Sequence, residues 1–156
     1  MISSEEFNAV NSMGHSFKKT RIIVADDHHL VRQALVSLLE KQPDFEVIAQ
    51  AADGEEAVNG ARKTIPDVII MDISMPKLSG LEATRLIKSQ YPQIGILALT
   101  VHSDNEHVLS ILQAGAGGYL TKTASDSEIV QAIRALAAGD TVLSPAISKR
   151  LVPLSS

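Results

Sequence analysis

Short apolar runs alternate along the chain with longer segments in which apolar residues recur at helical spacing. Five of the runs lack the polar alternation of a half-exposed strand and are typical of strands buried on both faces. These five runs are Ile22–Ala25, Phe45–Ala51, Asp67–Met71, Ile94–Leu99 and Gly118–Thr121. The pattern therefore predicts five buried strands.

The segments between the strands have the periodicity and the end signals of helices. Pro43, Pro66 and Gly139 mark three helix ends, and Ser125 with Glu128 forms a capping box at the start of the last helix. The expected helices cover Leu30–Lys41, Gly54–Thr64, Leu81–Tyr91, Asn105–Ala114 and Ser125 to Gly139. Their predicted inward residues are Val31, Leu35 and Leu38; Ala57, Val58, Ala61 and Ile65; Leu81, Thr84, Ile87 and Tyr91; and Ile129, Ile133 and Leu136.

Five strands that alternate with five helices predict an α/β fold. Because the strands are apolar on both sides, they favour a doubly wound, five-stranded parallel sheet with helices on both faces, a (βα)5 arrangement. In such sheets a ligand binds beyond the carboxyl ends of the strands, where the strand order reverses. Functional residues are therefore expected directly after the strands.

Composition narrows the class of protein. The chain has 156 residues, 45% of them hydrophobic, which suits one globular domain of the usual size, roughly 100–200 residues. Fourteen Lys and Arg against eighteen Asp and Glu leave a net charge of −4, which argues against direct binding of nucleic acid. The absence of cysteine excludes disulfides, zinc–cysteine sites, iron–sulfur clusters and thiol catalysis.

The sequence also indicates the cellular compartment of the protein. No apolar run approaches the ~20 residues of a membrane span, and the first residues do not have the basic and apolar parts of a signal peptide. We therefore expect a cytoplasmic protein with no membrane contact. Residues 1–19 are polar and aperiodic, and we expect them to form a flexible leader.

The residues that follow the strands carry the candidate chemistry. Asp26 and Asp27 follow the first strand, Asp72 the third, Thr100 the fourth and Lys122 the fifth. Singly, each has an ordinary explanation as a helix cap or a solvated charge, but together they occupy the ligand-binding edge of the predicted sheet. Three converging carboxylates repel one another and favour a bound cation, for which Mg²⁺ is the economical choice.

Two adjacent histidines, His28 and His29, stand beside these acids. Adjacent residues of a helix point in different directions, so the pair does not form a metal site by itself. We expect one ring at the rim of the site and the other in solvent.

From Lys19 to about Gly139 the sequence resembles the receiver domain of two-component response regulators, and most of all the LuxR/NarL-type group. The resemblance lies in four segments, whose residues are Ile22-Ile23-Val24-Ala25-Asp26-Asp27-His28; Asp67-Val68-Ile69-Ile70-Met71-Asp72-Ile73-Ser74-Met75-Pro76 with Gly80; Leu97-Ala98-Leu99-Thr100; and Ala114-Gly115-Ala116-Gly117-Gly118-Tyr119-Leu120-Thr121-Lys122. It implies a receiver domain over residues 20–139 with the strand order 2-1-3-4-5. The chain departs from many receivers at Thr123, where they have proline.

The resemblance implies a magnesium site and a phosphoacceptor. Asp72 would accept the phosphoryl group, Asp27 and Asp72 would bind Mg²⁺ directly, Asp26 would bind it through water, and the Ser74 carbonyl would complete the set. Such a domain is not an enzyme in the usual sense, because it catalyses only its own slow phosphorylation and dephosphorylation.

The resemblance also implies a switch. Lys122 and Thr100 would contact phosphoryl oxygens, and Thr100 would draw Tyr119 inward as it moves. The alternative interpretation of Tyr119 is a half-exposed aromatic residue at a strand edge, which would be favoured if Lys122 did not follow three residues later.

The implied partners are a sensor histidine kinase, which donates the phosphoryl group as a small phosphodonor also could, and a second copy of the chain. Receivers of this group commonly self-associate through the first and fifth helices after phosphorylation, and the kinase usually docks near the first. The apolar residues Leu30 and Val36, which are expected to face outward, would be candidate contacts there if they are exposed. Residues 140–156 resemble a linker toward a DNA-binding output module that is absent from this chain, so any contact with DNA would be made by that module.

Other functions remain open at this point. A stand-alone receiver in a phosphorelay would have the same residues. A phosphatase with an aspartate nucleophile is less favoured, because the acid it needs two residues after Asp72 is replaced by Ser74. A flavin module is disfavoured because Asp26 and Asp27 would repel the flavin phosphate.

Overall fold

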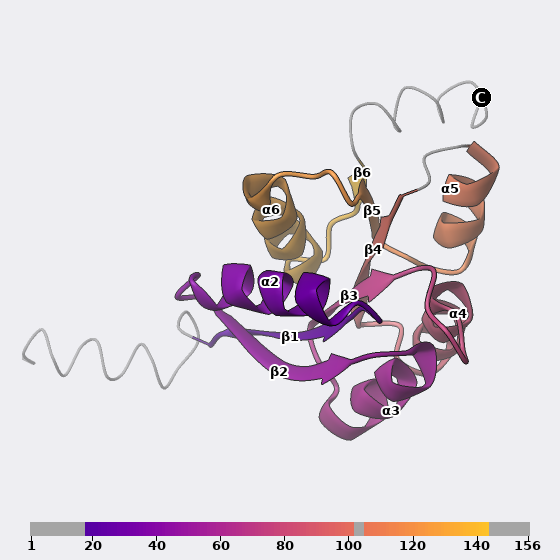
Figure 1. The fold of residues 1–156 in the computed structure, drawn as a ribbon, viewed down its shortest axis with the longest axis horizontal. Coiled ribbons are helices and arrows are strands. Elements are labelled where there is room, and N and C mark those ends of the chain that lie inside the picture. The colour runs from indigo at the N-terminus through magenta and orange to yellow at the C-terminus, as the bar shows by residue number, and fades with distance from the viewer. Residues whose placement is uncertain (1–17, 102–104, 144–156) are drawn as a thin grey trace, which may run out of the picture.

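The fold is a parallel sheet with helices on both faces (Figure 1). The computed structural model describes residues 18–101 and 105–143, and the strands in it have the order β2-β1-β3-β4-β5-β6. The strands are β1 (Thr20–Ala25), β2 (Phe45–Ala51), β3 (Val68–Asp72), β4 (Gly95–Thr100), β5 (Gly118–Thr121) and β6 (Val142–Leu143). The helices are α2 (His29–Glu40), α3 (Gly54–Thr64), α4 (Gly80–Gln90), α5 (Asn105–Gln113) and α6 (Asp126–Ala137).

The core consists of two apolar layers, one on each face of the sheet. Helices α2 and α6 cover one face, and α3, α4 and α5 cover the other (Figure 1). Successive side chains of a strand point to opposite faces. Accordingly, Ile23 of β1 packs in the layer beneath α3, while its neighbours Ile22 and Val24 pack in the layer beneath α2. This arrangement explains why the strands show no polar alternation.

The predicted fold class is confirmed, with one addition. The five expected strands are present, parallel and in the order 2-1-3-4-5. A sixth strand of two residues, β6, pairs with β5 inside the segment that the sequence assigns to the linker. Its Val142 N–H donates to the Gly117 carbonyl at 2.8 Å, so the sheet extends beyond residue 139.

The buried face of α2 differs from the predicted one. Leu35, Val36 and Leu39 are buried, whereas Val31 is 39% exposed. The helix carries apolar residues over a wide arc, so periodicity alone does not locate the centre of the buried stripe. Val36 is therefore wrong as a candidate surface contact, while Leu30, at 83% exposure, does face outward.

The loop after β3 is held between the starts of two helices. The Gly80 N–H donates to the Ile73 carbonyl at 3.0 Å, and a Cβ atom at Gly80 would overlap the backbone carbonyl of Asp72. A Cβ atom at Gly54 would overlap the Leu78 carbonyl in the same way. Close backbone approach at these two glycines thus fixes the loop that follows Asp72.

Two further expectations concern the ends of the chain and the membrane. Most of the expected leader, up to residue 17, and the linker from residue 144 onward lie outside the described residues. Among the residues that the structure describes, no helix is both long enough and apolar enough to cross a bilayer.

We expect Gly80→Ala to lower the free energy of unfolding by about 1–3 kcal/mol, because the added methyl group has to displace the backbone at Asp72. Gly60→Ala is the matched control: its Cβ atom would meet only the Ile23 side chain at 3.4 Å, and alanine is the better helix former. This control is expected to gain about 0.5–1 kcal/mol. Urea denaturation of both variants tests whether the close backbone approach at Gly80 fixes this loop, and equal stability of the two variants would contradict it.

Candidate functional site

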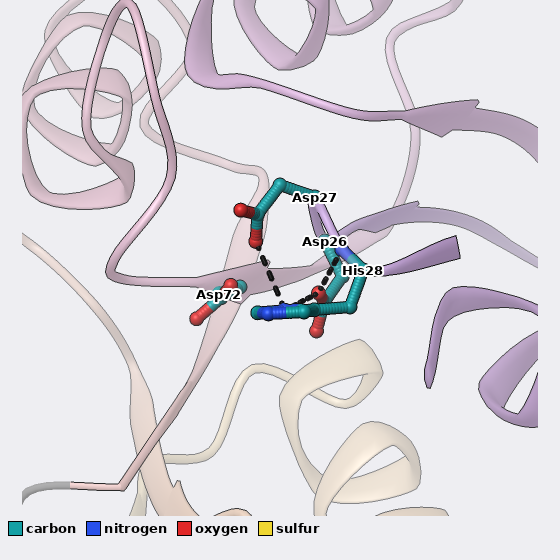
Figure 2. A group of neighbouring side chains, drawn as sticks. All are labelled: Asp26, Asp27, His28 and Asp72. Atoms are coloured by element: carbon teal, nitrogen blue, oxygen red, sulfur yellow. Dashed lines mark hydrogen bonds and ion pairs between the residues drawn. The ribbon is translucent and has the colours of Figure 1, made fainter. Parts of the chain in front are cut away.

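Three strand ends meet at one edge of the sheet and bring charged residues together there. Asp26, Asp27 and His28 follow β1, and Asp72 ends β3 (Figure 2). One potential ligand atom from each of these four residues lies within 4.8 Å of the other three. Lys122, which follows β5, reaches the same group. The structure therefore brings together the acids and the lysine predicted from the strand ends.

Asp26 makes the turn that leads from β1 into α2. Its backbone N–H donates to the Ala51 carbonyl at 3.0 Å, and its Oδ1 accepts from the His28 backbone N–H at 2.8 Å. The guanidinium of Arg32 donates to its carbonyl oxygen at 2.8 Å. Asp26 is therefore both a backbone turn residue and a buried carboxylate, at 1% exposure.

Asp72 is a buried carboxylate with one oxygen engaged and one oxygen unpaired. Its Oδ1 accepts from the Ser74 backbone N–H at 3.3 Å and lies 3.3 Å from the Lys122 ammonium. Its Oδ2 is buried with no hydrogen-bond partner. Burial, reinforced by the charge of Asp26, raises the pKa of Asp72 to about 6, although Lys122 and the Ser74 N–H act in the opposite direction.

Lys122 lies between two carboxylates. Its backbone N–H donates to the Thr100 carbonyl at 2.9 Å, and its Nζ lies 3.4 Å from Asp26 Oδ2 and 3.3 Å from Asp72 Oδ1. Burial favours a lower pKa for Lys122, but the two carboxylates outweigh it and raise the pKa. The side chain is 23% exposed, so the interpretation of Lys122 as a solvated surface charge is wrong.

The remaining predicted site residues occupy neighbouring positions. Thr100 ends β4 and is 1% exposed, and Ser74 lies in the loop after β3. Tyr119 lies in β5 with a fully buried side chain, and its strand pairs with β4 on one side and β6 on the other. The alternative of a half-exposed aromatic residue at the sheet edge is therefore wrong for Tyr119.

The sequence predicts that one of the two adjacent histidines lies at the rim of the site, but it does not predict that this residue is His28. Its Nδ1 lies 3.2 Å from Asp26 Oδ1 and 3.2 Å from Asp27 Oδ1, so the ring faces the acids (Figure 2). The ring of His29 instead contacts the Arg32 guanidinium at 3.2 Å. The sequence expectation of one histidine at the rim is met by His28, and only its position next to the two acids could have signalled this.

The cluster has the donor set of a divalent cation site. Three carboxylates are opposed by a single ammonium group, which leaves two negative charges without a counter-charge when His28 is neutral. The unpaired, buried Oδ2 of Asp72 is an oxygen donor in need of a partner. Mg²⁺ prefers oxygen ligands and is commonly held by one or two carboxylates plus waters, so the residues present fit this ion.

Comparison with known proteins identifies related sequences. The family model described as "Response regulator receiver domain" matches residues 22–134. The chain is 40% identical over 134 residues to the transcriptional regulatory protein DegU of Brevibacillus brevis, covering 86% of this chain and 57% of that protein. It is 44% identical over 131 residues to the response regulator GacA of Pseudomonas viridiflava, covering 84% of this chain and 61% of that protein. The chain thus spans about three fifths of the length of these relatives.

Solved structures show the same likeness. The crystal structure of a two-component response regulator of the LuxR family from Aurantimonas sp. SI85-9A1 superposes with a TM-score of 0.82 at 38% sequence identity. The match covers 88% of this chain and 99% of that one.

The raised pKa of Asp72 predicts a pH-dependent cost of folding in the absence of metal. A folded-state pKa of about 6, against 3.8 for the ordinary group, means that stability is greatest while the carboxyl is protonated and falls as pH rises from about 4 to 6. We expect Asp72→Asn to abolish this loss, so that its stability advantage over the unmodified chain grows by up to about 3 kcal/mol across that range.

Urea unfolding in the presence of a chelator, at a series of pH values from about 4 to 7.5, measures this difference. Asp126→Asn, which alters an exposed carboxylate in the first turn of α6, serves as the control and should show no such growth. An advantage of Asp72→Asn that stays constant with pH would contradict the prediction.

Proposed function

This chain belongs to the response regulator receiver family, and within it to the LuxR/NarL type, and we propose that it accepts a phosphoryl group on Asp72. The donor would be a sensor histidine kinase or a small phosphodonor such as acetyl phosphate. The observation that carries the proposal is the buried Asp72 carboxylate, with an unpaired Oδ2 and the Lys122 ammonium at its other oxygen. Phosphorylation would change the conformation and thereby control transcriptional output.

In the proposed reaction a phosphoryl group moves from the nitrogen of a phosphohistidine to a carboxylate oxygen of Asp72. A carboxylate oxygen of Asp72 would supply the electron pair that forms a new P–O bond, while the P–N bond of phosphohistidine breaks and the released imidazole takes a proton from solvent. The transition state is loose and anionic, so positioning and charge neutralisation dominate catalysis. Mg²⁺ bound by Asp26, Asp27, Asp72 and the Ser74 carbonyl would supply neutralising charge.

Lys122 and Thr100 would stabilise the transferred group. The Lys122 ammonium already lies 3.3 Å from Asp72 Oδ1, so it is placed to pair with a phosphoryl oxygen. Thr100 ends the strand next to β3, where its hydroxyl would donate to another oxygen. Autodephosphorylation would be slow, because the chain offers no acid in the position that a phosphatase uses.

The conformational response would pass through Thr100 and Tyr119. Movement of the Thr100 side chain toward the phosphoryl group would alter the packing around Tyr119, whose ring lies in the core layer with α4 and α5. In this structure the Tyr119 side chain is fully buried. The surface around β5 and the helices beside it would then change, as in other switches biased by a local charge event.

The partners follow from the same proposal. A histidine kinase would dock near α2, where Leu30 is 83% exposed, and phosphorylated chains would pair through α2 and α6. Residues 20–139 would act as the receiver domain in the cytoplasm. Since the chain spans about three fifths of its relatives' length, control of DNA would belong to an output module that follows the linker at 140–156.

Incubation with acetyl phosphate and Mg²⁺ is expected to add one phosphoryl group per chain, as seen by intact-protein mass spectrometry. The adduct should be stable in acid and labile in base, as an acyl phosphate is. Asp72→Asn should abolish it, because the amide is not a nucleophile, and Asp126→Asn should retain it. Continuous release of phosphate over many turnovers would instead support the alternative phosphatase function.

We expect Lys122→Met to slow phosphorylation by acetyl phosphate by about 10²-fold, because removal of one group that stabilises developing charge typically costs about 10²–10³-fold. The methionine side chain keeps the length of lysine and removes its charge. Lys63→Met, at an exposed position near the end of α3, is the matched control and should react at the unmodified rate. The initial rate of adduct formation is the measurement, and a rate equal to the control's would contradict the role of Lys122.

A further inference from the structure

His28 occupies a helix position at which its side chain makes no capping hydrogen bond. It is the N-cap residue of α2, yet its side chain caps none of the backbone N–H groups. Ser, Thr, Asp and Asn are the residues that fill this position when capping is needed. The ring of His28 turns instead toward the carboxylates of Asp26 and Asp27 (Figure 2).

We propose that His28 is a nitrogen ligand of the cation held by Asp27 and Asp72, and that the site therefore takes first-row transition dications such as Ni²⁺ and Co²⁺. This inference rests on the proposed cation site and specifies the class of ion that it favours. It assigns to this chain a ligand beyond the oxygen donors already described.

The geometry supports a shared cation. The candidate ligand atoms of His28 and the three acids all lie within 4.8 Å of one another. Two ligands on opposite sides of such an ion, each at about 2.1 Å, lie about 4.2 Å apart, so the cluster closes around an ion with small side-chain movements. The His28 side chain is 64% exposed, and its ring can make this movement without disturbing the core.

The unpaired Oδ2 of Asp72 is an independent sign that the cluster receives a ligand. This atom is buried in a residue that is 2% exposed, and an acceptor in such a place normally has a partner. No donor among the described side chains pairs with it. A cation held by Asp72 and His28 together would satisfy this oxygen.

The imidazole changes which ion is preferred. Mg²⁺ is bound through oxygen and keeps several waters, so it gains little from a ring nitrogen. Imidazole suits later first-row ions, whose affinity for such sites generally rises from Mn²⁺ to Cu²⁺. A site with oxygen ligands alone also follows this order. What distinguishes the proposed site is therefore that its preference for Ni²⁺ over Mg²⁺ depends on His28.

His29 offers a matched control in the neighbouring position. Its ring contacts Arg32 at 3.2 Å and is absent from the four-residue cluster. Both histidines are exposed, and both are at the start of α2. His28→Asn and His29→Asn therefore make the same chemical change, one inside the proposed ligand set and one outside it. Because Asn is among the preferred N-cap residues, His28→Asn keeps the start of the helix.

The test is calorimetric titration of the full chain and the two variants with Ni²⁺ and, separately, with Mg²⁺. His28→Asn should weaken Ni²⁺ binding by at least about tenfold, since loss of even a ligand-orienting group typically costs about 10–100-fold. Its Mg²⁺ affinity should change by less than about twofold, and His29→Asn should leave both affinities unchanged. Asp72→Asn should lower the affinity for both ions, which assigns the titrated site to the cluster.

Proton NMR of the Co²⁺-loaded chain gives a second readout. A coordinated imidazole should show ring-proton signals shifted far outside the diamagnetic range, and His28→Asn should remove them while His29→Asn retains them. A Ni²⁺ to Mg²⁺ affinity ratio that is unchanged in His28→Asn would overturn this inference and leave the magnesium site standing. Equal weakening of both ions would also overturn it. Failure of the unmodified chain to bind either ion would overturn the proposed cation site itself.

Discussion

The structure depends on the contact between one partly buried ammonium and two buried carboxylates at the carboxyl edge of the sheet. Lys122 Nζ lies 3.3–3.4 Å from Asp26 and Asp72, which belong to the ends of two other strands. Unit charges 4 Å apart interact by about 4 kcal/mol near a protein surface, so the same lysine offsets much of the repulsion between the two acids. Asp27 adds a further negative charge to the cluster. The edge therefore retains an excess of negative charge.

The rest of the fold keeps these charges from moving apart. The ends of β1, β3 and β5 are fixed by the parallel register, and the two apolar layers hold the sheet from both faces. Beyond Asp72, the loop is clamped where α4 begins, since Gly80 packs directly on the Asp72 carbonyl. A more flexible edge would relieve the repulsion by separating the acids. Here relief has to come from a proton or from a cation, and burial together with the charge of Asp26 raises the pKa of Asp72.

The sequence was most informative where strand position alone decides the outcome. Asp26, Asp72 and Lys122 could be placed together because parallel strands end at one edge, and this needs no knowledge of side-chain packing. The buried face of α2 depends on tertiary contacts that choose among many apolar residues, so periodicity places Val36 on the wrong side of the helix. The strand β6 is two residues long and arises from pairing with β5, which leaves almost no local signal. The orientation of the His28 ring is a rotamer choice within the folded cluster, and periodicity does not report it.

A bound cation would have two effects of different size: it would favour loss of the Asp72 proton, and it would reduce the repulsion between the acids and a negatively charged phosphodonor. With a pKa of about 6, the Asp72 carboxyl is mostly ionised at pH 7, so in the proposed reaction loss of its proton would not be the main obstacle to attack on phosphorus. A phosphoryl group approaching in the proposed reaction would carry negative charge and would meet a cluster of three carboxylates opposed by one ammonium. Repulsion between these groups would therefore be the larger barrier, and it would act on the phosphodonor before any bond forms. A cation in the cluster acts chiefly on this repulsion, so the arrangement of the acids governs access of the donor more than the basicity of the nucleophile.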